Sequence, residues 1–211
     1  MKNYISINNQ KIELTEEQGK RIAESLNQDI CERENPGIKL AEVPAGEVVE
    51  VGGYELLVLE QLGESTAVIC KDLVGDDSAF GENNNYDGSY VDEICNSFSE
   101  AIADAVGEDN LLAHTVDLTS DDGLKDYGMV ERRVSLLTAQ MYRKYVEILD
   151  TVKPNRWWWL ATAHSTKKHE NDFWAKCVSP SGCVNGNVLY DNIDIGVRPF
   201  CILKSNIFVS Q

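Results

Sequence analysis

Residues 156–200 read RWWWLATAHSTKKHENDFWAKCVSPSGCVNGNVLYDNIDIGVRPF, and this stretch decides how the chain is interpreted. It holds three compact blocks, Trp157–Thr162, Cys177–Gly182 and Gly196–Phe200. Before the last block, Val184–Ile195 mixes polar, aromatic and aliphatic residues with no steady strand or helix period. Large aromatic residues that frame an irregular polar and aromatic segment are typical of a displayed binding surface. The stretch therefore favours a binding protein over an enzyme, although composition alone leaves a plain loop equally open for Val184–Ile195.

The aromatic residues of this stretch are expected to be mostly structural. On a strand, Trp157 and Trp159 face one side and Trp158 the other. Each buried Trp removes on the order of 200 Å² from water, an upper bound of about 5 kcal/mol. Exposing all three would therefore be unfavourable. Arg198, which lies between apolar residues and next to Pro199, is likewise expected to be a buried, hydrogen-bonded arginine.

The charge of the chain excludes some classes of partner. The 211 residues carry a formal net charge of −16 and give a pI near 4.5. Nucleic acids and anionic membrane surfaces are bound through Lys and Arg, so neither is an expected partner. No apolar run approaches the roughly 20 residues that span a bilayer. Met1–Ser6 lacks the apolar stretch of a secretory signal, so a cytoplasmic location is expected.

The first 35 residues are predicted to form a small hairpin-helix appendage. Tyr4–Leu14 alternates around Asn8-Asn9-Gln10, which indicates a hairpin. Thr15 and Gln18 match a capping box, and they predict a helix over about residues 16–27. The sequence Asn35-Pro36-Gly37 breaks the chain. The main domain is predicted over residues 45–211.

The main domain is predicted to be α+β with short antiparallel strands and two helices. Strands are expected at residues 48–51, 54–60, 66–73 and 134–137, and a polar loop at 117–128. Ser89 and Thr138 are predicted N-caps of the two helices, each with one apolar face. No helix is expected after Pro154. The apolar segment Phe200–Val209 is predicted to pair with an early strand and close the domain.

Motifs for metal, cofactor or nucleophilic chemistry are weak or missing in the sequence. Asn83, Asn85, Asp87 and Gly88 imitate half of a calcium loop, but an Asx-rich turn before a helix is the better interpretation. His164, His169, Cys177 and Cys183 fit no zinc spacing, so neither a metal nor a cofactor is expected. No G-x-S-x-G or phosphate-binding glycine motif is present. The six cysteines are expected to be mostly buried thiols, and a Cys177–Cys183 bridge stays open.

Three of these blocks resemble a domain of unknown function that is common in phages and gut bacteria. In that domain a W-W-L-R-S block is followed by V-x-x-x-G and a terminal G-V-R-P. The corresponding residues here are Trp157–Leu160, Val178–Gly182 and Gly196–Pro199, with Ala161-Thr162 in place of Arg-Ser. Gly196-Val197-Arg198 also resembles the G-F-R close of the formylglycine-generating-enzyme-like branch of the C-type lectin fold. The resemblance covers Gly53–Val209 and implies a C-type lectin-like fold with two flanking helices and long C-terminal loops.

Members of that branch include the hypervariable proteins of diversity-generating retroelements, in which asparagine codons scatter to many residue types. The resemblance implies a ligand-binding, variable surface. Its candidate positions are Ala163, His164, Phe173, Ala175, Asn185, Asn187, Leu189, Tyr190, Asp191, Asn192, Ile193 and Asp194. The sugar-binding motifs of C-type lectins are absent, so calcium-dependent glycan binding is not expected.

Three hypotheses of function follow. The favoured one is a non-enzymatic phage or prophage protein that binds a macromolecular ligand, expected to be a protein, through its C-terminal loops. The second is an enzyme of the same fold that uses the thiol of Cys177 or Cys183. The third is a virion structural protein that forms homo-oligomers through residues 1–34.

Overall fold

The computed structural model describes residues 3–7, 10–15, 17–22, 37–189 and 195–211. The chain separates into two compact units, Met1–Gly37 and Ile38–Gln211. The larger unit begins before the expected residue 45, because β3 (Ile38–Lys39) pairs with β16 (Phe208–Val209) and Leu40 in η1 (Leu40–Glu42) is fully buried. No helix among the described residues is long and apolar enough to cross a membrane.

The smaller unit contains the predicted hairpin. Strands β1 (Asn3–Ile7) and β2 (Gln10–Leu14) pair antiparallel. The capping box is also present: the Thr15 amide donates to Oε1 of Gln18 at 3.0 Å, and the Gln18 amide donates to Thr15 Oγ1 at 3.2 Å. Residues 17–22 are helical, and the rest of the predicted helix lies outside the described residues.

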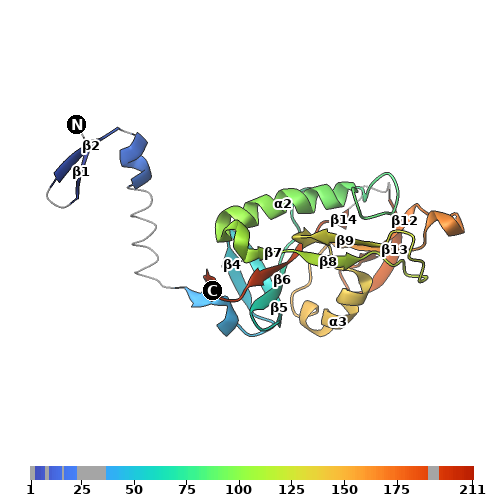
Figure 1. Cartoon of the computed structure of the whole chain (residues 1–211). Coiled ribbons are helices and arrows are strands. Elements are labelled where there is room, and N and C mark those ends of the chain that lie inside the picture. The colour runs from blue at the N-terminus through green and yellow to red at the C-terminus, as the bar shows by residue number, and fades with distance from the viewer. Residues whose placement is uncertain (1–2, 8–9, 16, 23–36, 190–194) are drawn as a thin grey trace. The chain divides into compact units, whose positions relative to one another are not determined.

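The larger unit is a mixed α+β structure built on two sheets (Figure 1). The first sheet has the order β10-β15-β6-β5-β4, and β7 also pairs with β15. Its strands are β4 (Val48–Val51), β5 (Tyr54–Gln61), β6 (Ser65–Cys70), β7 (Leu111–Leu112), β10 (Val134–Ser135) and β15 (Phe200–Lys204). Strand β15 lies antiparallel to β6, which confirms that the end of the chain closes the domain.

The second sheet has the order β13-β12-β11-β14 and carries the stretch from which the sequence was interpreted. Its strands are β11 (Trp157–Ala163), β12 (Trp174–Val178), β13 (Val184–Val188) and β14 (Ile195–Gly196). The β11–β14 pair is parallel, unlike the expected antiparallel pattern. A separate hairpin pairs β8 (His114–Asp117) with β9 (Met129–Arg132) on either side of the predicted polar loop.

The two helices cover different faces of the sheets. Helix α2 (Tyr90–Val106) and helix α3 (Ala139–Leu149) lie on opposite sides of them (Figure 1), and each begins at its predicted cap. Ser89 accepts from the Asp92 amide, and Thr138 accepts from the Met141 amide. Short 3₁₀ segments, η2 (Glu108–Asn110) and η3 (Lys167–His169), are the remaining helical turns among the described residues of this unit.

The core is divided by the sheets into two hydrophobic clusters. One contains the buried face of α2 together with Trp159, and half-buried Trp157 packs against it. The other contains the buried face of α3 together with Trp158. The alternation predicted for the Trp triplet is therefore present, with Trp158 and Trp159 both fully buried.

Arg198 is buried as predicted and joins distant parts of the chain. Its guanidinium donates to the carbonyls of Cys70, Lys71 and Val152 at 2.8–3.2 Å. Burial lowers the pKa of Arg198 to about 10. The neighbouring Gly196 leaves no room for a side chain, because an added Cβ would lie 2.6 Å from Cδ1 of Leu73.

Candidate functional site

The candidate surface comprises strand β13 and the loop of residues 164–173, which joins β11 to β12. In the second sheet, β12 pairs with both β11 and β13. The amide of His164 donates to the carbonyl of Trp174 at 2.9 Å, so the two ends of the loop are held together. The loop therefore projects from adjacent ends of two paired strands.

The structure divides the twelve candidate positions into three groups. His164 and Asn185 are exposed, Phe173 keeps 43% of its surface exposed, and Asn187 is half-buried. Ala163, Ala175 and Leu189 are buried, at 1%, 0% and 0% exposure, so their assignment to the surface is wrong. Ala175 alternates with Trp174 along β12 and therefore points into the core beside Cys177. Tyr190, Asp191, Asn192, Ile193 and Asp194 lie outside the described residues.

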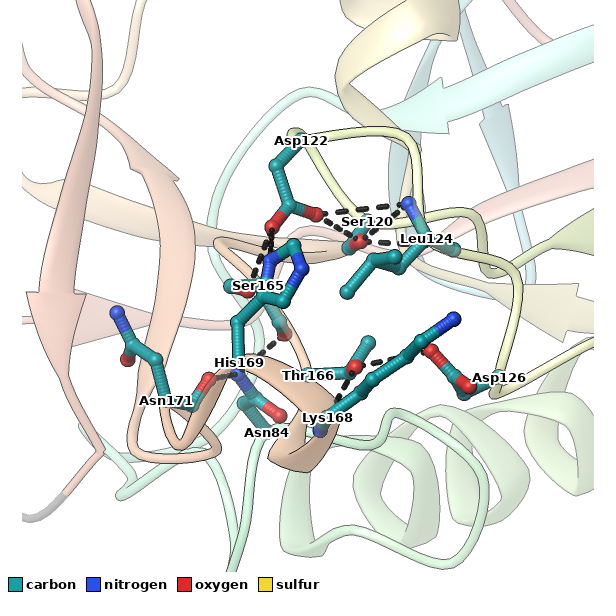
Figure 2. A network of polar contacts seen from close by, with 10 residues as sticks. All are labelled: Asn84, Ser120, Asp122, Leu124, Asp126, Ser165, Thr166, Lys168, His169 and Asn171. Carbon is teal, nitrogen blue, oxygen red and sulfur yellow. Dashed lines mark hydrogen bonds and ion pairs between the residues drawn. The ribbon is translucent and has the colours of Figure 1, made fainter.

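The loop is held in place by Asn84, a fully buried residue from a distant part of the chain (Figure 2). Its Nδ2 donates to the carbonyls of Ser165, Asn171 and Trp174 at 3.0, 3.3 and 2.8 Å. The hydroxyl of Tyr127 donates to its Oδ1 at 2.6 Å. The Asn84 amide also donates to the carbonyl of Asp172. One side chain thus fixes two points of the loop's main chain and the first residue of β12.

Asp122 holds the same loop through side-chain contacts (Figure 2). The hydroxyls of Ser120 and Ser165 donate to its two oxygens at 2.5 and 2.6 Å. Nδ1 of His169 lies 2.9 Å from Oδ2 of Asp122. The hydrogen bonds from Ser120 and Ser165 hold the pKa of Asp122 well below its usual range, so the carboxylate is charged near neutral pH. Thr166 donates similarly to Asp126 at 2.9 Å.

This arrangement includes a histidine–aspartate pair but does not form a catalytic triad. In a triad, the serine hydroxyl contacts the imidazole nitrogen that faces away from the carboxylate. Here both serine hydroxyls contact the carboxylate, and no nucleophile among the described residues is hydrogen-bonded to Nε2 of His169. The network instead fixes the loop, including Glu170, whose φ of 54° makes it the one described non-glycine residue in the left-handed region.

The alternative sites considered in the sequence have plain structural accounts. The Asn83–Gly88 segment forms the predicted Asx turns, in which Asn83 Oδ1 accepts from the Asn85 amide at 2.9 Å. Among the described residues, no group of three or more His, Cys, Asp or Glu is placed to hold a metal ion. Cys177 and Cys183 are both free, so the open question of a bridge is answered. Burial raises the pKa of the Cys177 thiol to about 11, which disfavours the reactive thiolate.

Comparisons of the chain with family models, with curated proteins and with solved structures return no match. The candidate site therefore rests on the geometry of the loop of residues 164–173 and strand β13. Sequence reasoning did not find Asn84 or Asp122, whose partners in and beside the loop are 43 to 90 residues away along the chain.

Proposed function

We propose that this chain is a non-enzymatic ligand-binding protein with a C-type lectin-like domain. Its ligand would contact the loop of residues 164–173 and strand β13, together with residues 190–194. The observation that carries the proposal is the set of hydrogen bonds from Asn84 to the carbonyls of Ser165 and Asn171 in the loop and of Trp174 at its end. A loop whose backbone is fixed before binding loses less conformational entropy when a ligand arrives.

The exposed side chains around the fixed loop suit a protein partner. Phe173 offers an aromatic ring at 43% exposure, and His164 and Asn185 offer polar groups that can donate or accept. Aromatic side chains among adaptable polar ones are typical of protein-binding surfaces. An enzymatic function finds less support among the described residues of this surface, because no nucleophile is hydrogen-bonded to Nε2 of His169.

The proposal includes diversification of this surface, as in the variable proteins of diversity-generating retroelements, and a phage or prophage origin. The Asn84 side chain donates hydrogen bonds to main-chain carbonyl oxygens, which every residue type supplies. The loop can therefore change side chains and keep these contacts. Sequencing of the encoding locus tests this part: we expect a reverse transcriptase gene and a near-repeat of the coding sequence for residues 156–203 that differs at adenines. A locus with neither would refute diversification and leave the binding proposal to its own test.

Photocrosslinking tests the binding proposal directly. Phe173 is replaced by p-benzoylphenylalanine, and Phe208, which is 64% exposed on β16, receives the same replacement as a matched control. Both proteins are mixed with solubilised bacterial surface proteins and irradiated. We expect an adduct of defined mass at position 173 only, competed away by unlabelled wild-type protein and not by the variant His164→Ala/Asn185→Ala. Equal adducts at both positions, or competition by the double variant, would refute the surface.

A further inference from the structure

A second site is indicated by a cavity of ≈ 220 Å³ whose lining includes Ser120 and Asp121. It lies between the loop that follows β8 and the start of α3, and Thr162 of β11 contributes to its wall. Its volume is below that of the pockets that hold drug-sized molecules. The residues that decide its chemistry are Asp117, Asp121, Thr138, Gln140, Arg143 and Thr162.

The side formed by α3 and β11 has unused hydrogen-bond donors. Thr138 and Thr162 are only 6% and 4% exposed. The oxygen of each hydroxyl accepts from a backbone amide, of Met141 and Ala139 respectively. Neither hydroxyl donates its own hydrogen to any described residue. Because a buried donor without an acceptor is unfavourable, these two hydroxyls indicate an acceptor inside the cavity.

The charged groups add a positive and a negative end. The Asp121 carboxylate forms ion pairs with two side chains, since Nη2 of Arg143 and Nζ of Lys176 each lie 3.1 Å from one of its oxygens. Together these three groups carry one net positive charge, with Asp121 and Arg143 in the lining of the cavity and Lys176 outside it. At the loop end, Asp117 accepts from the amide and hydroxyl of Thr119 through Oδ1 alone, which leaves Oδ2 for a ligand. Those hydrogen bonds lower the pKa of Asp117, so its carboxylate stays charged.

We propose that this cavity binds a small zwitterion, of the size and type of an α-amino acid. The ligand's carboxylate would accept from Thr138, Thr162 and Arg143, and its ammonium group would donate to Asp117. A simple anion fits less well, because it gives Oδ2 of Asp117 no partner and must approach a chain of net charge −16. A simple cation leaves the two threonine hydroxyls without an acceptor.

Titrations of the ¹⁵N-labelled full chain followed by NMR test this site, with glycine and L-alanine as probes. We expect saturable shifts of the amides of Asp117, Thr138 and Gln140 at millimolar concentrations. Acetate and methylammonium, which each carry one of the two charges, are expected to bind at least about tenfold more weakly. The absence of saturable shifts up to about 50 mM glycine or L-alanine, or equal affinity for acetate, would overturn the proposal.

Two variants connect the binding to the named residues. Arg143→Gln is expected to weaken binding of glycine about tenfold, and its side chain is 60% exposed, so the fold should tolerate the change. Thr162→Val, which keeps the shape but removes this donor together with the acceptor of the Ala139 amide, is expected to weaken binding similarly. Arg133→Gln is the matched control, because it removes an exposed arginine paired with Glu108 away from the cavity. Unchanged affinity in Arg143→Gln, or an equal loss in Arg133→Gln, would refute the assignment.

Discussion

Replacing Asn84 by Ala should destabilise the larger unit and release the loop of residues 164–173. The substitution removes four hydrogen bonds, three donated to main-chain carbonyl groups and one from Tyr127. Two amide hydrogens serve the three carbonyls, so the donated bonds are worth less than three independent ones. At about 1 kcal/mol for each bond, with the buried carbonyl of Ser165 losing this donor, we expect a loss of about 3 kcal/mol in the free energy of unfolding.

Urea unfolding followed by tryptophan fluorescence measures this loss. All four Trp residues lie in the larger unit, so the signal does not depend on the smaller one. Hydrogen exchange adds the location: the amides of Glu170 and Asn171, which donate within the loop, should exchange faster in Asn84→Ala. The control is Asn83→Ala, which removes a single Asx bond from an exposed residue. A loss below about 1 kcal/mol in Asn84→Ala, or loop amides that exchange at the wild-type rate, would refute the anchoring role.

Three further predictions concern residues outside the loop. Burial lowers the pKa of His114 to about 4 despite the nearby Glu131, so the stability that neutral His114 contributes is complete above the unfolded pKa near 6.5 and is lost as the pH falls towards 4. Between pH 7.5 and 5, the free energy of unfolding of the wild type should fall by about 2 kcal/mol more than that of His114→Asn, and equal losses in urea unfolding would contradict this. Gly196→Ala should lower the free energy of unfolding by about 1–3 kcal/mol, because the added Cβ would contact Leu73. Gly186→Ala, whose Cβ would lie 3.4 Å from the Trp174 ring, should be less destabilising, and the reverse order in thermal unfolding would disprove the packing argument. In the native variant Cys31→Ser, iodoacetamide should modify the exposed Cys183 and leave the buried Cys177 unmodified, as measured by mass spectrometry. Modification of Cys177 would contradict this and support the hypothesis of a cysteine-dependent enzyme.

The elements with strong local signals could be predicted from the sequence. Ser89 and Thr138 both cap helices as expected, since an N-cap depends on residues within one turn. The Trp triplet alternates between two cores because a strand leaves no other arrangement. The β8–β9 hairpin was missed, since Val116 is the only fully buried residue in the four of β8 and gives too short a pattern to read.

The candidate surface was less predictable, because residues on one face of a sheet differ in exposure between its interior and its edge strands. Ala175 and Asn187 are direct partners across β12 and β13, yet Ala175 is buried and Asn187 is half-exposed at the edge of the sheet. Composition does not distinguish these two positions. Asn84 and Asp122 gave no signal either, because a polar residue in a loop looks the same whether it faces water or a distant carbonyl.

The two anchors place different demands on the loop of residues 164–173. Asn84 contacts main-chain carbonyls, so its contacts survive a change of side chain at Ser165 or Asn171. Asp122 contacts the hydroxyl of Ser165 and the imidazole of His169, so its contacts depend on those residue types. His164 and Phe173 belong to neither anchor. In variants that keep this loop conformation, substitutions should therefore concentrate at His164 and Phe173 and avoid Ser165 and His169. This expected distribution of substitutions follows from the hydrogen bonds alone and needs no assumption about the ligand.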